Sequence, residues 1–127
     1  MEFESYARDG FVMLPGFLDA PAIGEVSTQL DRVVRDVVPS MPAEHVFYEE
    51  KGDHSTLKQL QHLDEHDAWF GLLFREGRFR GLAEELLQGP VVPKNFQYFN
   101  KPPGVGKPTP PHQDGYYFKL DPCEAVA

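Results

Sequence analysis

The stretch NKPPGVGKPTPPHQDGYYF, residues 100–118, decides the fold of this 127-residue chain. Its proline- and glycine-rich part, residues 102–111, is incompatible with a helix or the interior of a paired strand, because proline fixes φ and lacks the backbone N–H donor. Strand-like sequence lies on both sides of this loop, over residues 91–101 and 112–120. The stretch therefore predicts two strands joined by a loop in the C-terminal part of the chain.

His112 and Asp114 are the strongest candidate site residues in this stretch. Positions two apart on a strand share a face, so the imidazole and the carboxylate would point the same way. They are two of the three ligands in a 2-His-1-carboxylate site, which holds non-haem Fe(II) and leaves coordination positions open. Taken alone, the tripeptide fits equally well a solvent-exposed histidine and aspartate at the start of a strand.

The N-terminal part of the chain is predicted to be largely helical. Residues 2–9 indicate a short helix that Gly10 ends. Asp19 is the predicted N-cap of a second helix, which Pro39 would stop. Apolar residues at helical spacing predict that one face of this second helix packs in the core. They are Ile23, Val26, Leu30, Val33, Val34 and Val37.

Shorter elements complete the predicted order. Residues 11–14 are a strand candidate, and residues 39–56 indicate a surface loop with a short strand at Val46–Tyr48. Residues 66–76 and 78–88 predict two further helices, and residues 123–127 resemble the start of another strand. Helices that precede strands in this way indicate the α+β class.

Composition excludes several classes of function. Acidic residues outnumber basic ones, 20 to 12, and the lysines and arginines form no cluster, which argues against binding to nucleic acid or to anionic membranes. The longest apolar run, residues 68–74, is too short to span a bilayer. The N-terminus lacks the pattern of a signal peptide, and the single Cys123 suits a reducing compartment. We therefore expect a soluble cytoplasmic protein.

A second metal motif lies upstream. The stretch HLDEH, residues 62–66, fits the H-x-x-E-H pattern of inverted zinc peptidases. On a helix, His62 and His66 would lie one turn apart and share a zinc ion, with Glu65 as the base. Short motifs of this kind often arise by chance, and exposed surface histidines are the ordinary interpretation of this one.

Two further polar residues have a functional interpretation beside an ordinary one. Lys58 lies in a stretch whose apolar residues recur every three positions, which predicts packing, and its ammonium would suit the carboxylate of an anionic co-substrate. In the predicted strand, Gln97 lies on the face opposite Phe96 and Tyr98 and would donate an amide hydrogen bond. Both residues would otherwise be ordinary surface side chains.

Two blocks make the chain resemble the phytanoyl-CoA dioxygenase family of Fe(II)/2-oxoglutarate oxygenases. The first is DGFVMLPGFL, residues 9–18, which is similar to the family's opening block and precedes an amphipathic helix. The second runs from NKPPG, residues 100–104, to PHQD, residues 111–114, with aromatic residues after it. The resemblance spans essentially the whole chain and corresponds to the first half of a typical family domain.

The resemblance implies a fold of N-terminal helices packed on an incomplete double-stranded β-helix, which is a cupin-like jelly roll. We expect residues 1–127 to be the N-terminal part of a single domain of this kind. Within it, residues 1–90 are expected to be helical and residues 91–127 to begin the β-core.

The resemblance also implies a ligand set and a reaction. His112 and Asp114 would bind iron, and Lys58 and Gln97 would contact 2-oxoglutarate. The family's second iron-binding histidine and its 2-oxoglutarate-binding arginine come from later strands, so neither is expected in this chain. The implied reaction is hydroxylation of an unactivated C–H bond of a small organic substrate, with 2-oxoglutarate converted to succinate and CO2. On its own, the chain is expected to show little or no turnover.

A different class of function stays open. A chain that holds half of the fold would also suit a non-catalytic binding or interaction module. Unpaired strand edges would then invite self-association.

Overall fold

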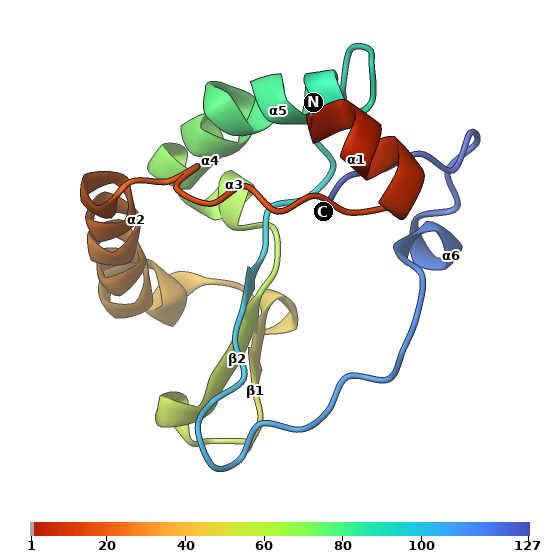
Figure 1. The fold of residues 1–127 in the computed structure, drawn as a ribbon. Coiled ribbons are helices and arrows are strands. Elements are labelled where there is room, and N and C mark those ends of the chain that lie inside the picture. Colours follow the sequence, from red (N-terminus) through yellow and green to blue (C-terminus); the bar gives the residue numbers. More distant parts are fainter. Residues whose placement is uncertain (1) are drawn as a thin grey trace.

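The computed structural model describes residues 2–127 and combines helices with one small antiparallel sheet, which confirms the α+β class (Figure 1). The sheet has the order β1-β2-β3, with β1 Val46–Tyr48, β2 Leu57–Leu60 and β3 Tyr98–Phe99. The α-helices are α1 Glu2–Asp9, α2 Ala20–Arg32, α3 Leu63–His66, α4 Ala68–Arg75, α5 Arg78–Leu86 and α6 Asp114–Phe118. The remaining turns are a π-helix over Val33–Val37 and 3-10 helices over Val38–Ser40, Ala43–His45 and His54–Thr56.

The helices surround one end of the sheet and leave its other end open (Figure 1). Helix α2 lies to one side, whereas α4, α5 and α1 lie beyond the end of the strands, with α1 packed against α5. Helix α6 lies on the side away from α2, at the end of a long extended segment that leaves β3. None of the helices in residues 2–127 has the length and apolar character needed to cross a membrane.

A β-bulge in β2 determines which side chains enter the core. Leu57 and Gln59 pair with consecutive residues of β1, which leaves Lys58 between them as an extra residue. In a regular strand, Leu57 and Leu60 would point to opposite faces, because they lie three positions apart. The extra residue turns both leucines to the core, where Leu57 is buried and Leu60 is fully enclosed.

The core lies between the sheet and the surrounding helices. Three buried side chains, those of Leu57, Leu60 and Leu63, lie at the spacing that predicted packing. The π-helical turn adds the buried side chain of Val33, and α4 adds that of Phe70. Partly buried side chains complete the cluster: Val26, Leu30, Val37, Val38, Met41, Val46, Tyr48, Trp69, Leu73, Phe96 and Tyr98. Two of these, Phe96 and Tyr98, were predicted to share a face.

The predicted apolar face of the second helix is confirmed only in part. Val33 is fully buried, whereas Ile23 is 49% exposed and Val34 is 41% exposed. After Arg32 the helix changes to π geometry, in which the N–H of Val38 donates to the carbonyl of Val33. A π turn contains more residues than an α turn and shifts the stripe, so that Val34 is exposed whereas Val37 and Val38 still pack against the core.

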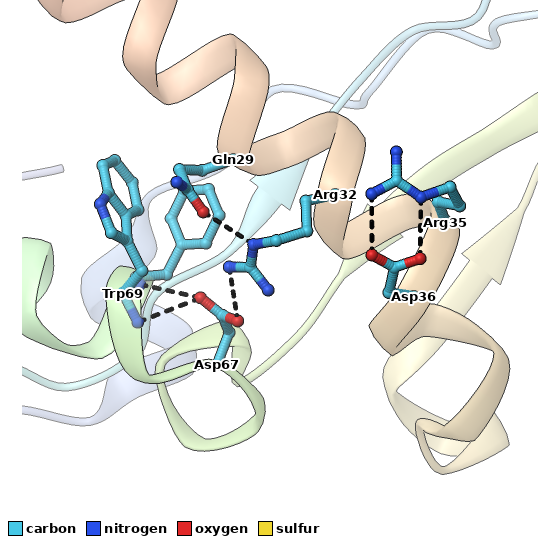
Figure 2. A network of polar contacts seen from close by, with 7 residues as sticks. Gln29, Arg32, Arg35, Asp36, Asp67 and Trp69 are labelled. Carbon is cyan, nitrogen blue, oxygen red and sulfur yellow. Dashed lines mark hydrogen bonds and ion pairs between the residues drawn. The ribbon is translucent and has the colours of Figure 1, made fainter.

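Asp67 joins α2 to the start of α4 (Figure 2). Its Oδ1 accepts hydrogen bonds from the backbone N–H groups of Trp69 and Phe70, at 3.1 and 3.2 Å, and so caps α4. Its Oδ2 accepts from Nη2 of Arg32 at 2.8 Å. Nε of Arg32 in turn donates to Gln29. The Asp67 side chain is 8% exposed, so this carboxylate is buried, and it accepts hydrogen bonds from Arg32, Trp69 and Phe70.

Several predicted elements are confirmed. The first helix ends before Gly10, and the side chain of Asp19 caps the second helix by accepting from the N–H of Ala22. The short strand at Val46–Tyr48 is present, and the two predicted central helices appear as α4 and α5. Local signals carried these predictions, namely helix caps and apolar periodicity.

Three predicted strands are wrong. Residues 11–14 and 123–127 have no regular secondary structure, and residues 112–120 contain the short helix α6. A strand needs a partner that accepts and donates its backbone hydrogen bonds. In the described part of the chain none of these segments has such a partner, and a helix satisfies its backbone groups locally.

The strand predicted over residues 91–101 is formed only at Tyr98–Phe99. The residues before it are held by α3 instead of by a strand, because the N–H of Phe96 donates to Oδ1 of Asp64 and its carbonyl accepts from the N–H of Leu63. Strands β1 and β2 also lie within residues 1–90, where mainly helices were predicted.

We predict that Asp67→Ala lowers the free energy of unfolding by about 2 kcal/mol, because the change removes the cap of α4 and leaves Arg32 without its carboxylate. Chemical denaturation followed by circular dichroism measures this effect. Asp36→Ala is the matched control, because Asp36 pairs with the neighbouring Arg35 on the exposed surface (Figure 2). The control should change stability by less than about 0.5 kcal/mol. Equal losses in the two variants would contradict the role of Asp67.

Candidate metal and co-substrate site

His112 and Asp114 converge although the strand that was predicted to align them is absent. Gln113, between them, has extended backbone with φ −117° and ψ 128°, so the side chains on either side of it leave the chain in the same direction. Asp114 then begins α6. As a result, Nε2 of His112 lies 3.2 Å from Oδ1 of Asp114, and both side chains are partly exposed.

The hydrogen bonding of His112 suits a metal ligand. Its Nδ1 lies 2.9 Å from the carbonyl oxygen of Pro110, which can only accept, so Nδ1 carries the ring proton. Nε2 faces the Asp114 carboxylate, and when Nε2 carries no proton its lone pair is free to bind a cation together with that carboxylate. Two ligands at right angles around a metal ion, each about 2.1 Å from it, lie about 3 Å apart. The donor types and their separation therefore fit a divalent metal ion.

The pair is incomplete as a metal centre. Within residues 2–127, no third histidine, cysteine, aspartate or glutamate side chain joins His112 and Asp114 to form a metal-binding group. The ring of Tyr117 packs edge-on against His112, with ring centroids 5.6 Å apart. Two protein ligands leave most positions around a metal ion open to water or other small ligands.

Lys58 and Gln97 lie on one face of the sheet. Because the bulge turns Leu57 and Leu60 into the core, the two residues between them, Lys58 and Gln59, point to the opposite, open face. Gln59 donates a side-chain hydrogen bond to Oε1 of Gln97, which places Gln97 on this face as well. The Gln97 amide N–H groups stay available as donors.

Glu49 is the direct partner of Lys58. It follows β1, and its Oε1 lies 3.2 Å from Nζ of Lys58 and accepts from the backbone N–H of Lys107 at 3.4 Å. Burial raises the pKa of Glu49, but the hydrogen bonds from Lys58 and Lys107 and the charges of both lysines lower it by more, so the pKa lies below its ordinary value. The carboxylate is therefore ionised at neutral pH, and the contact is lost only when the pH falls through this lowered pKa.

Comparison with known proteins identifies the family. The sequence profile of the phytanoyl-CoA dioxygenase family (PhyH) matches residues 6–127. The chain belongs to the phytanoyl-CoA dioxygenase family. The two blocks that carried the resemblance lie within the matched region.

A curated relative of the family is L-proline trans-4-hydroxylase from Streptomyces griseoviridis, which is 29% identical over 109 residues. The alignment covers 86% of this chain and 38% of the relative, so the chain spans less than half of that protein's length. No solved structure matches the chain significantly.

The structure does not bring the two pairs of candidate residues together. Lys58 belongs to β2 and Gln97 directly precedes β3, whereas His112 and Asp114 lie at the start of α6, which is separated from the sheet in Figure 1. In the part of the chain that the structure describes, no hydrogen bond or ion pair links His112 or Asp114 to the sheet. The loop over residues 102–111 is the covalent connection between them.

The geometry on which the zinc-peptidase interpretation depended is not formed. His62 precedes α3 in a left-handed conformation, with φ 54°, and so does not occupy the helix with His66. Glu65 contacts Nδ1 of His62 at 3.3 Å, and Nε2 of His66 lies 2.8 Å from Nδ1 of His45. These side chains form a polar cluster among themselves and not a metal site, since no such group exists among residues 2–127.

Sequence reasoning missed Glu49. It lies in an acidic stretch that was interpreted as a surface loop, and nothing in its composition separates Glu49 from Glu50. The available signal was alternation after the predicted strand Val46–Tyr48, which places Glu49 on the same face as Phe47 and opposite the core. The bulge at Lys58, which brings the lysine to that face, had no signal in the sequence.

We predict that Gly115→Ala disturbs the segment that holds the metal-ligand pair. A Cβ at Gly115 would overlap Sγ of Cys123, so the methyl group must displace this sulfur from its place beside α6. The rate at which Cys123 reacts with a soluble thiol reagent should rise. Gly81→Ala is the control, because a Cβ there meets open space on α5 and should stabilise the helix by about 0.5–1 kcal/mol. An unchanged reaction rate in Gly115→Ala would show that the contact does not persist in solution.

Proposed function

We propose that this chain carries part of the active site of an Fe(II)/2-oxoglutarate-dependent dioxygenase that hydroxylates a small organic substrate. The observation that supports this most directly is the convergence of His112 and Asp114, 3.2 Å apart, in a chain of the phytanoyl-CoA dioxygenase family. The name of the curated relative, a proline hydroxylase, agrees with hydroxylation as the type of reaction. The proposed fold of the whole domain is a jelly roll, of which β1, β2 and β3 would form a part.

In this proposal His112 and Asp114 hold Fe(II), which when bound supplies oxygen activation coupled to oxidation of 2-oxoglutarate. His112 would bind through Nε2, because its Nδ1 proton is directed at Pro110. Asp114 would add a negative charge that partly balances the metal. The exposure of both side chains leaves room for co-substrate and oxygen on the solvent side.

Lys58 and Gln97 are proposed to bind 2-oxoglutarate from the open face of the sheet. The Lys58 ammonium would attract a carboxylate, and the Gln97 amide would donate a hydrogen bond to an oxygen of the same molecule. For both pairs of residues to contact one co-substrate, the loop over residues 102–111 must carry α6 toward this face. We therefore propose that α6 lies closer to the sheet in the complete site than it does in Figure 1.

We predict that His112→Ala weakens Fe(II) binding at least tenfold, because it removes one of two protein ligands. Anaerobic calorimetric titration of the chain with Fe(II) measures the dissociation constant, and the weak visible band of chelated iron on addition of 2-oxoglutarate reports the ternary complex. His54→Ala is the matched control, since His54 is an exposed histidine whose Nδ1 contacts the Tyr48 hydroxyl. The proposal fails if both histidine variants bind iron as the unmodified chain does.

A further inference from the structure

Glu49 occupies an unusual position for a charged side chain. Its side chain is 3% exposed, whereas the side chain of its partner Lys58 is 36% exposed and can still be reached from solvent. The N–H of Glu49 donates to the carbonyl of Thr56 at 3.0 Å, so its backbone is fixed at the end of the β1–β2 hairpin. The carboxylate therefore contacts Lys58 from a position whose backbone is fixed, while part of the Lys58 side chain stays exposed to solvent.

The same carboxylate oxygen contacts a second segment. Oε1 of Glu49 accepts from the backbone N–H of Lys107, which lies in the loop that leads to His112. One buried oxygen thus holds both the proposed co-substrate lysine and the loop that connects the sheet to the proposed iron ligands. This link joins two parts of the site that are otherwise apart in the structure (Figure 1).

We propose that Glu49 is an internal carboxylate that occupies Lys58 until a dicarboxylate ligand replaces it, and that this exchange loosens the loop at Lys107. The inference rests on the proposed function of Lys58. It assigns to Glu49 the role of a positioning residue, because Glu49 acts through Lys58 and through the loop and not on the reacting atoms.

Electrostatics favours a ligand that replaces Glu49 at Lys58 over one that binds Lys58 together with Glu49. A dicarboxylate that approached Lys58 with Glu49 still in contact would bring like charges close together in a partly desolvated place, where they repel more strongly than in water. An ammonium bound by one carboxylate is already neutralised, so it attracts a second anion weakly. If Glu49 turns away from Lys58, the lysine charge is available to the ligand.

The exchange has a consequence for the loop. If the Glu49 carboxylate turns away from Lys58, the backbone N–H of Lys107 loses its acceptor. This N–H lies in an exposed loop, and its hydrogen bond to Glu49 is long, at 3.4 Å. The loop over residues 102–111 would then be free to move α6 relative to the sheet. Binding of the co-substrate at Lys58 would in this way favour the approach of the iron ligands that a complete site needs.

The test uses succinate, a dicarboxylate that needs no metal ion, titrated into the intact chain and followed by backbone amide NMR. Glu49→Gln keeps an acceptor oxygen for Lys58 and Lys107 but removes the charge, so it should bind succinate on the order of tenfold more tightly than the unmodified chain. Lys58→Met should abolish binding in both backgrounds. In the unmodified chain, the Lys107 amide signal should move as succinate binds, which tests the exchange without any variant.

Glu50→Gln is the matched control, because Glu50 is the exposed neighbour and its change alters the net charge equally. This control should bind succinate like the unmodified chain. The exchange is overturned if Glu49→Gln binds succinate no more tightly than the unmodified chain, or if the Lys107 signal does not move. Either result leaves the role of Lys58 intact. If no form binds succinate, or if binding survives Lys58→Met, the assignment of Lys58 fails together with the inference.

Discussion

The bulge at Lys58 is the constraint on which the arrangement of this structure depends. By adding one residue to β2, it allows Leu57 and Leu60 to enter the same core although they lie three positions apart. The two polar residues between them must then point away from the core. Burial of the two leucines stabilises the fold, and the same backbone geometry directs Lys58 and Gln59 away from the core.

The charged contacts of Lys58 follow from its outward orientation at the bulge. Lys58 on the open face lies within reach of Glu49, which alternation places on the same face after β1. The contact continues to the N–H of Lys107 and so reaches the loop that leads to His112. A stabilising feature of the sheet is in this way connected to the residues proposed for chemistry, even though α6 lies apart from the sheet (Figure 1).

Local signals predicted much of the helical part and little of the strand part. The Asp19 cap depends on neighbours in sequence and is confirmed. The spacing of residues 57, 60 and 63 correctly predicted that they pack, although residues 57 and 60 lie in β2. The strand predicted over residues 112–120 failed because strands depend on partners, and the described chain offers none there. His112 and Asp114 nevertheless lie close together without a strand, because one extended residue, Gln113, is enough to align them.

The sequence by itself determined the family, through two motif blocks, and the pair of candidate metal ligands, through a spacing of two residues. Only the tertiary structure decided which face Lys58 occupies, and that Glu49 and Lys107 meet it. The reason is physical: motifs and caps are properties of adjacent residues, whereas a bulge is chosen by the packing of leucines against distant helices. A half-buried ion pair then forms between the charges that this packing leaves side by side, here Glu49 and Lys58.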